Sequence, residues 1–537
     1  MSGKSDQKCA PDAGSSRIPR ESRIARLAVS AMAGILLSLA AISYVAAREP
    51  RTARAASPFQ WRGVIQGQYG PQFNASQRRR LLRFMSRNGF NAYVHAPKGD
   101  PYQRTLWREP YPAARQAELN AEVGLASRLG IAWIPNVSPA APRFSSPGDA
   151  APPGTAPSPP ICFSSESDLE QLLAKLAPFG AAGARAFMVS FDDVKRRFSC
   201  AADSAAYGDG DRAFGLATAD LLDRLEAGLR ARDPEARLLT VSSDYKGTED
   251  SDYLRGLRER LAAGIDVMWT GDRTESRPFT PDQADAYGEL VGRAPVVWEN
   301  WTTNDALGPD PDWPARVFLG PYGRRADVAG HVGGFFFNPA NQADLNFLPL
   351  ATAGRWMRHP GRYRPRRAFL RETRRLAGRQ APALRAFAEA NYSTTLRGSV
   401  EAPTLKRLIH RFLRARDRHQ HVRRAAAHLR HELQLAVGAR RHLLRVGRLH
   451  PFVRQARPFL RSVRLNARAG LIATDLLQTK RKHRRHLRHL RHRLHRALRR
   501  AARWPSESFG TRTHLYGLTG NVIDRYVASV RHRDRRR

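Results

Sequence analysis

The chain has 537 residues, more than a single hydrophobic core usually organises, so at least two folded domains are expected. Hydrophobic residues make up 42% of it, which excludes disorder throughout. The formal net charge of +42 is unevenly distributed, because residues 401–537 contain 37 Lys and Arg against 7 Asp and Glu. We therefore expect chemistry based on acidic side chains and the excess basic charge to belong to different domains.

The N-terminal residues have the order of an export signal. A basic flank, 1–23, precedes an apolar segment, 24–47, and a linker, 48–57. The apolar segment is about as long as a membrane helix requires, and its last residues are small enough for signal-peptidase cleavage. A cleaved signal and an uncleaved anchor therefore both remain open. Either one leaves the rest of the chain outside the cytoplasm, so the protein is predicted to be exported, as a secreted or membrane-anchored chain.

Short apolar runs alternate with amphipathic stretches over residues 58–362. Strands are expected at 64–65, 91–96, 131–137, 186–191, 238–242, 265–270, 295–299 and 332–337. Helices are expected at 76–87, 112–129 and 214–229, and a surface insertion at 140–160. Eight such units predict a closed (β/α)8 TIM-type barrel. An open doubly wound sheet is the alternative, although no Gly-rich phosphate loop precedes a first helix.

The strand signal disappears after residue 362, and residues 363–537 are predicted to form a basic all-α helical bundle. The apolar residues of 405–413 and 469–477 have helical spacing, and so do Leu443, Leu444 and Val446. Residues 480–500 consist almost entirely of Arg, His and Leu, with a narrow leucine stripe on a basic helix.

Two consecutive aspartates, Asp192 and Asp193, follow the buried strand at 186–191. A parallel barrel presents its reactive groups at the carboxyl ends of its strands. Two carboxylates this close do not both ionise freely, so one can keep a proton beside an anionic neighbour. That combination suits cleavage of a glycosidic bond.

Eight short motifs follow one another along the barrel region: 63–70 (GVIQGQYG), 93–102 (YVHAPKGDPY), 107–111 (WREPY), 191–193 (FDD), 269–271 (WTG), 298–305 (WENWTTND), 319–322 (LGPY) and 338–339 (NP). In this order they resemble glycoside hydrolase family 84, which comprises β-N-acetylglucosaminidases such as protein O-GlcNAcases and bacterial hyaluronidases. The resemblance covers about residues 61–360 and implies a retaining enzyme whose substrate's own acetamide acts as nucleophile, with no cofactor and no metal.

The resemblance also implies a role for individual residues. Asp193 would be the general acid and base, and Asp192 would hold the acetamide N–H. Tyr245 would donate to the acetamido oxygen, and Trp298 would line the pocket for the acetamide methyl. The residues expected to hold the sugar hydroxyls are Gly67, Lys98, Asn300, Asp305 and Asn338.

Four positions depart from the family pattern. The family usually has Glu-Gly-Phe-Tyr-Gly where this chain has Gln66 and Gln68, and Trp-Asp-Asn where it has Glu299, while Lys195 adds a positive charge. Two alternatives to an enzyme acting on terminal N-acetylglucosamine therefore remain open. One is a hyaluronan-cleaving endo-enzyme, and the other is a non-catalytic glycan- or polyanion-binding surface protein on a decayed barrel.

The expected partner is a glycan or glycoprotein that contains N-acetylglucosamine. The basic C-terminal region has three interpretations: a solvated bundle, a contact with an anionic polymer or membrane surface, or recruitment of a polyanionic substrate. Specific nucleic-acid binding is not expected, because aromatic residues for stacking are sparse there. Cys162 and Cys200 either form one bridge or remain as two buried thiols.

Overall fold

A computed structural model of the protein describes residues 57–140, 156–305, 316–393, 396, 401–503 and 519–535. Residues 57–537 form one compact unit, which is distinct from residues 1–56. The predicted export segment, 24–47, and most of the predicted insertion lie outside the described residues. Within the described ranges, no helix combines the length and the apolar content needed to span a bilayer.

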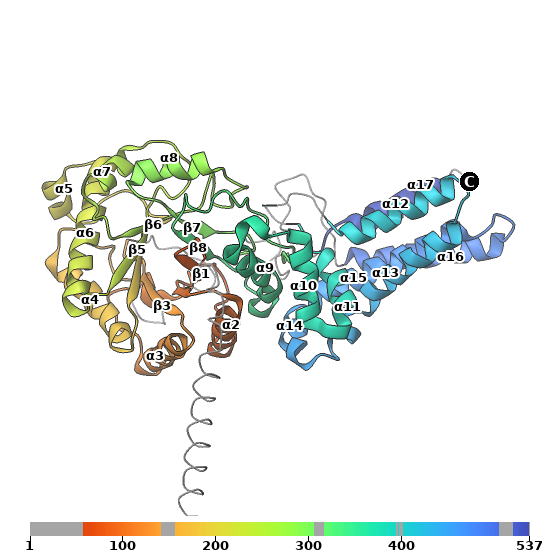
Figure 1. Ribbon diagram of the computed structural model, residues 1–537, viewed down its shortest axis with the longest axis horizontal. Coiled ribbons are helices and arrows are strands. Elements are labelled where there is room, and N and C mark those ends of the chain that lie inside the picture. The colour runs from red at the N-terminus through yellow and green to blue at the C-terminus, as the bar shows by residue number, and fades with distance from the viewer. Residues whose placement is uncertain are drawn as a thin grey trace, which may run out of the picture. The chain divides into compact units, whose positions relative to one another are not determined.

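Eight parallel strands close into a barrel in chain order (Figure 1). They are β1 (Trp61–Gln66), β2 (Ala92–His95), β3 (Ala132–Val137), β4 (Ala186–Ser190), β5 (Arg237–Val241), β6 (Asp266–Trp269), β7 (Val296–Glu299) and β8 (Gly334–Phe337). The ring closes where β8 pairs with β1, with Gly334 opposite Trp61. The predicted barrel is thereby confirmed, and the closure excludes an open doubly wound sheet.

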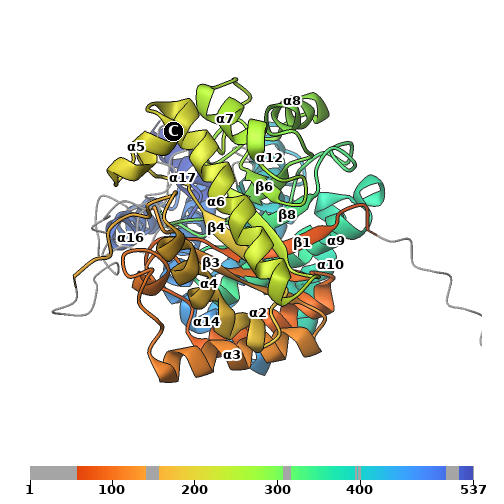
Figure 2. The same ribbon diagram turned by 90° about the vertical axis from the view of Figure 1, so that its left-hand side faces the viewer.

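Helices cover the outside of the strands, as Figure 2 shows. They are α2 (Ala75–Asn88), α3 (Ala113–Arg128), α4 (Glu166–Ala181), α5 (Ala201–Tyr207), α6 (Asp211–Arg232), α7 (Asp252–Arg260), α8 (Pro281–Val291) and α9 (Phe347–Arg358). The start of α2 is set by a capping box, in which the Asn74 side chain accepts from the backbone N–H of Gln77 while the Gln77 side chain accepts from the backbone N–H of Asn74. The three helices predicted here correspond to α2, α3 and α6.

Side chains on the inner face of the strands fill the barrel, so its axis is a packed core rather than a channel. Ile65, Met188 and Phe336 belong to this inner cluster and are fully buried. Gly63 is required in β1, because a Cβ atom there would lie 2.1 Å from the Phe336 ring. The interior therefore supports a pocket only at an end of the barrel.

The remainder of the described chain is helical. Its helices are α10 (Pro365–Ala377), α11 (Ala381–Glu389), α12 (Pro403–Asp417), α13 (Val422–Leu443), α14 (His450–Gln455), α15 (Arg457–Gln478), α16 (Arg484–Ala502) and α17 (Val522–Arg535). They share one apolar core, to which the α16 stripe contributes Leu487, Leu490 and Leu494. The helix predicted through Leu444 and Val446 is wrong in its extent, because α13 ends one residue earlier and Leu444 is 38% exposed.

The helical region packs against the barrel. Val317 and Leu345, which precede and follow β8, belong to the same apolar core as the C-terminal helices. Arg316 forms a fully buried ion pair with Glu401, and the Gln455 side chain accepts from the backbone N–H of Asp344. The loops that follow β7 and β8 are therefore braced by residues far along the chain.

Candidate active site

A cavity of about 120 Å³ lies at the carboxyl ends of the strands. Seven of the eight strands, all except β3, contribute a described lining residue at their carboxyl end or in the loop that follows it. The lining residues are Gly67, Tyr69, Lys98, Asp192, Asp193, Val241, Tyr245, Thr270, Thr274, Glu275, Trp298, Asn300, Thr303, Asp305 and Asn338. All nine residues predicted from the sequence are brought together around this cavity, although their individual roles stay predictions.

Asp192 is the buried member of the aspartate pair, at 8% exposure. Its Oδ2 atom forms an ion pair with the Nζ atom of Lys98, which is also buried. Its Oδ1 atom has no hydrogen-bond partner among the described residues, although it is itself buried. Because Lys98 compensates the charge of Asp192, the repulsion expected between two neighbouring carboxylates is reduced.

Asp193 is exposed and has a left-handed backbone conformation, with φ of 58°. Few residues other than glycine adopt that conformation, but aspartate and asparagine do so more readily than most. The turn separates the two aspartates, so that Asp193 lies at the cavity mouth. There its Oδ2 atom accepts from the Tyr69 hydroxyl and its Oδ1 atom from the Tyr245 hydroxyl, each at 3.0 Å.

One wall of the cavity is held by a chain of hydrogen bonds. The backbone N–H of Gly67 donates to Asn338, whose side-chain amide donates to Asn300 at 2.8 Å. The indole N–H of Trp298 donates to the same Asn300 oxygen at 2.9 Å. A Cβ atom at position 67 would lie 2.4 Å from the Trp298 ring, so only glycine permits this approach. Asn300 therefore ties this wall together.

The tyrosines and Asp305 are shifted toward their neutral forms. Burial raises the pKa of Tyr69 and of Tyr245, and the nearby charge of Asp193 raises both further. Both hydroxyls consequently stay protonated donors well into the alkaline range. Burial also raises the pKa of Asp305, while the backbone N–H of Tyr69, at 2.8 Å from its Oδ2 atom, opposes that shift.

The departure at Glu299 has a structural explanation. Glu299 lies at the end of β7, is 1% exposed, and forms a two-pronged ion pair with Arg324 at 2.5 and 3.0 Å. The Tyr322 hydroxyl donates to it at 2.9 Å. Glu299 does not line the cavity. The methylene group by which it is longer than the family's aspartate therefore extends its carboxylate toward Arg324, outside the cavity.

The other departures, one at the end of β1, one just after it and one after β4, differ from one another. Gln66 is buried and accepts from the Tyr93 hydroxyl at 2.6 Å. Gln68 is also buried, and neither polar atom of its side chain has a partner among the described residues. Lys195 is exposed and does not line the cavity.

Six lining residues were not predicted. Tyr69 is the most informative of them, because it is the second hydroxyl that holds Asp193. Its position three residues after the end of β1 was the available signal, since polar residues after barrel strands usually face the site. Thr274 and Glu275 lie in the loop after β6, which carried no motif beyond the strand end.

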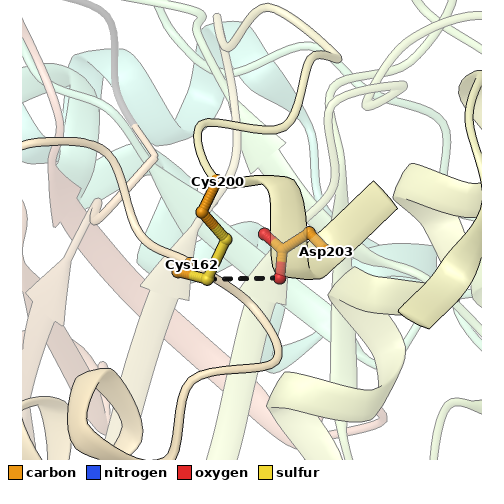
Figure 3. Close-up of side chains that lie close together, drawn as sticks. All are labelled: Cys162, Cys200 and Asp203. Atoms are coloured by element: carbon orange, nitrogen blue, oxygen red, sulfur yellow. Dashed lines mark hydrogen bonds between the residues drawn. A yellow bond between two sulfur atoms is a disulfide. The ribbon is translucent and has the colours of Figure 1, made fainter. Parts of the chain in front are cut away.

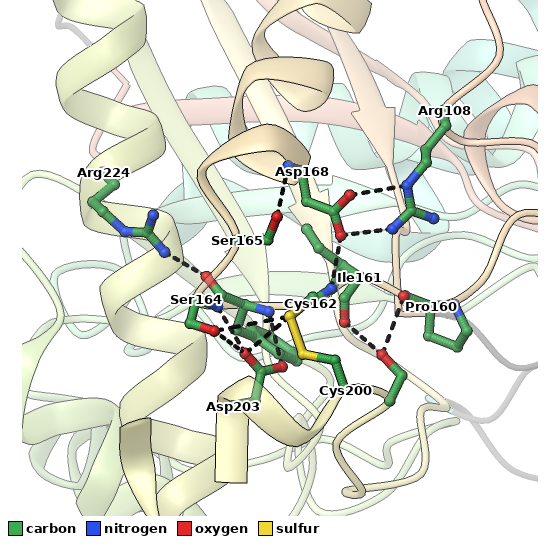
Figure 4. Close-up of a disulfide and its surroundings, with 12 residues drawn as sticks. Arg108, Pro160, Ile161, Cys162, Ser164, Ser165, Asp168, Cys200, Asp203 and Arg224 are labelled. Atoms are coloured by element: carbon green, nitrogen blue, oxygen red, sulfur yellow. Dashed lines mark hydrogen bonds and ion pairs between the residues drawn. A yellow bond between two sulfur atoms is a disulfide. The ribbon is translucent and has the colours of Figure 1, made fainter. Parts of the chain in front are cut away.

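A disulfide joins Cys162, before α4, to Cys200, the residue before α5 (Figure 3). Asp203 lies beside it and is fully buried; its carboxylate accepts from the backbone N–H groups of Phe163 and Ser164 and from the Ser164 hydroxyl (Figure 4). The bridge resolves the choice that the sequence left open. Among the described residues, these three side chains are also the only group of potential metal ligands that lie close enough together to bind one ion. Sulfur atoms bonded to each other are not thiolate ligands, so the grouping does not fit a metal.

A closed (β/α)8 barrel with paired aspartates in a small cavity at the carboxyl ends of its strands is an arrangement typical of barrel glycoside hydrolases. The chain matches the β-N-acetylglucosaminidase family over residues 62–389. It therefore belongs to that family, glycoside hydrolase family 84, as the motifs suggested.

Relatives of known identity agree with this assignment. The chain is 29% identical to the protein O-GlcNAcases of Rattus norvegicus and Mus musculus over 301 residues. That match covers 55% of this chain but only 29% of each relative. A solved mutant of the O-GlcNAc hydrolase of Thermobaculum terrenum is 25% identical, with a TM-score of 0.70 over 88% of this chain and 94% of that chain. A protein named CpGH84B, 21% identical, shares the fold with a TM-score of 0.72 over 88% of this chain and 77% of that one.

Proposed function

We propose that this protein is a retaining β-N-acetylglucosaminidase that hydrolyses terminal β-linked N-acetylglucosamine by substrate-assisted catalysis. The observation that carries the proposal is the Oδ1 atom of Asp192. It is buried, lines the cavity, and has no hydrogen-bond donor among the described residues. A buried acceptor left without a donor costs roughly 1–3 kcal/mol or more, and the N–H of a bound acetamide would supply the missing donor.

The reaction would proceed in two displacements at the anomeric carbon. In the first, the acetamido oxygen of the sugar attacks that carbon, the bond to the leaving oxygen breaks, and an oxazolinium ion forms that keeps the acetamide N–H. Asp193 gives its proton to the leaving oxygen. In the second, water attacks the same carbon, the ring C–O bond of the oxazolinium breaks to restore the acetamide, and the Asp193 carboxylate takes a proton from the water. Two inversions leave the configuration retained.

The other lining residues would bind and orient the sugar. Lys98 forms an ion pair with the Oδ2 atom of Asp192, and the Oδ1 atom would accept from the acetamide N–H as charge develops on the ring nitrogen. Tyr245 would turn from Asp193 to the acetamido oxygen when substrate binds. Trp298 and Val241 provide apolar walls for the acetamide methyl group. The hydroxyls of the sugar would contact Asp305, Asn338 and the backbone of Gly67.

The substrate is proposed to be the terminal sugar of a glycan or glycoprotein. Two observations support this choice. A cavity of about 120 Å³ is small for a ligand site and suits one sugar ring better than a threaded polymer. Relatives at 29% identity are named protein O-GlcNAcases.

The acid role is tested with a series of aryl N-acetylglucosaminides of graded leaving-group ability. Asp193→Asn should slow substrates with poor leaving groups by about 10²–10⁴-fold and those with good leaving groups much less. Asp192→Asn is the matched control, because it acts on the acetamide and should slow both kinds by the same factor. Equal loss across the series for Asp193→Asn would remove Asp193 as the acid.

The acetamide role is tested by changing the substrate instead of the protein. Replacing the 2-acetamide with a hydroxyl removes the internal nucleophile, so turnover should fall below detection. Comparable rates on plain glucosides would refute substrate assistance. Absence of turnover on every N-acetylglucosaminide, with the fold intact by circular dichroism, would favour the non-catalytic glycan-binding alternative.

We propose also that the enzyme works outside the cytoplasm. The order of residues 1–57 and the bridge between Cys162 and Cys200 both support this, because disulfides persist mainly in oxidising compartments. Alkaline phosphatase fused after residue 57 should be active in a bacterial host. An inactive fusion that gains activity when a known export signal replaces residues 1–47 would contradict the proposal.

A further inference from the structure

A second hollow, of about 770 Å³, lies on the C-terminal helices far along the chain from the candidate active site. It is formed by α13, α15 and α16, of which α15 packs against both of the others (Figure 1). We call it the arginine groove. Its lining residues are Arg430, Gln434, Leu465, Arg468, Leu471, Ile472, Asp475, Arg493, Arg496, Ala497 and Arg500.

The groove carries positive charge that the described protein does not neutralise. Among the described lining residues are five arginines and one acidic residue, Asp475, which is paired with Arg430 at 2.6 Å. The other four are exposed and have no ion pair or hydrogen bond with another described residue. Nearby, burial and the charges of other arginines lower the pKa of Arg464. Like charges are thus concentrated here without compensation.

The floor of the groove is apolar. Leu465, Leu471, Ile472 and Ala497 are half-buried side chains between the arginines. No aromatic residue is among the described residues that line the groove, so they offer no stacking surface of the kind that nucleic-acid bases use. On α16 the groove extends from Arg493 to Arg500, which is roughly 10 Å at the rise of an α-helix. That length accommodates one or two phosphate groups rather than a long polymer.

We propose that the arginine groove binds the phosphate headgroups of anionic phospholipids at a membrane surface. The guanidinium groups of Arg468, Arg493, Arg496 and Arg500 pair with phosphate oxygens, for which their planar forked geometry is well suited. The apolar floor contacts the glycerol and first acyl carbons. Charge complementarity extends beyond the groove, because α16 contains eight arginines and no acidic residue. This proposal does not depend on the glycosidase activity.

The test uses residues 57–537, which form a compact unit without the N-terminal segment, so the predicted export segment does not contribute to membrane binding. Binding to sedimenting vesicles is measured with 30% phosphatidylglycerol in phosphatidylcholine and with pure phosphatidylcholine. The groove variant is Arg493→Gln with Arg496→Gln. The matched control, Arg423→Gln with Arg424→Gln, removes the same charge from exposed residues of α13 that do not line the groove.

Binding is expected to require phosphatidylglycerol and to fall steeply with added salt. At about 1 kcal/mol per arginine near the surface, the groove variant should bind about thirtyfold more weakly, and the control less than threefold. Equal losses of vesicle binding in the two variants would refute a specific site in the groove and would favour attraction by the overall positive charge of the helices. Binding to soluble heparin or duplex DNA without binding to vesicles would overturn the lipid assignment. Circular dichroism verifies that both variants are folded.

Discussion

The buried ion pair between Glu299 and Arg324 lies outside the cavity, and we expect it to stabilise the fold. Breaking the pair tests this explanation for the glutamate that follows Trp298. Each side chain of the pair with Arg324 is 1% exposed, and Glu299 accepts three hydrogen bonds, two from Arg324 and one from Tyr322. Replacing Arg324 by Met keeps most of the volume but leaves a buried carboxylate with one donor. Breaking a buried pair in this way costs about 3–5 kcal/mol.

The assay is urea unfolding followed by circular dichroism and by tryptophan fluorescence, to which Trp298 and Trp301 on either side of Glu299 contribute. Arg324→Met should lower the free energy of unfolding by about 3–5 kcal/mol. Adding Glu299→Gln should restore at least about 2 kcal/mol, because the amide needs no charged partner. A loss below about 1 kcal/mol for Arg324→Met, or a double variant less stable than the single one, would refute this reasoning.

Three further predictions concern the cavity and the C-terminal helices. Gly67→Ala would place a Cβ atom 2.4 Å from the indole of Trp298, so the wall must move and kcat/KM should fall about 100-fold in the aryl glycoside assay. Tyr69→Phe should lower kcat about tenfold with KM unchanged, and the wild-type rate should show no tyrosine titration up to about pH 10, because the pKa of Tyr69 is raised. Burial raises the pKa of Asp524 to about 6, so the folded state binds its proton more tightly and stability falls as pH rises from about 4 to 6. Asp524→Asn should therefore raise the free energy of unfolding at pH 7.5 by about 2 kcal/mol. This figure already subtracts about 1 kcal/mol for the favourable interaction that an aspartate makes at the start of a helix. At pH 4 the substitution should have little effect, and urea unfolding midpoints at the two pH values would measure both outcomes.

The fold could be read largely from the sequence because each barrel strand is a short apolar run with a break on either side. The run at 186–191 is buried throughout, and polar residues follow it directly. The rule that parallel strands deliver their functional groups at one end predicted Asp192 and Asp193, whereas the other seven predicted residues of the cavity came from the resemblance to the family. The extent of helices was harder to predict, as at Leu444, because helical spacing continues past the point where packing stops.

Long-range partnerships could not be predicted. Nothing near Asp192 in the sequence indicates that Lys98, 94 residues earlier, neutralises it. Likewise Glu299 reads as a departure from the family until Arg324 is seen against it. Such pairs depend on which loops meet in space, and a single sequence does not encode that in any local pattern. Tyr69 was missed for the opposite reason, since its local signal was present but its partner, Asp193, was not apparent.

The disulfide between Cys162 and Cys200 records whether a given chain folded in an oxidising compartment. A chain in which this disulfide has formed is lighter than the reduced chain by the mass of two hydrogen atoms, and the difference persists after purification. Mass spectrometry of the native polypeptide, alkylated before lysis, would therefore report the surroundings in which each copy was assembled, without any tag or fusion.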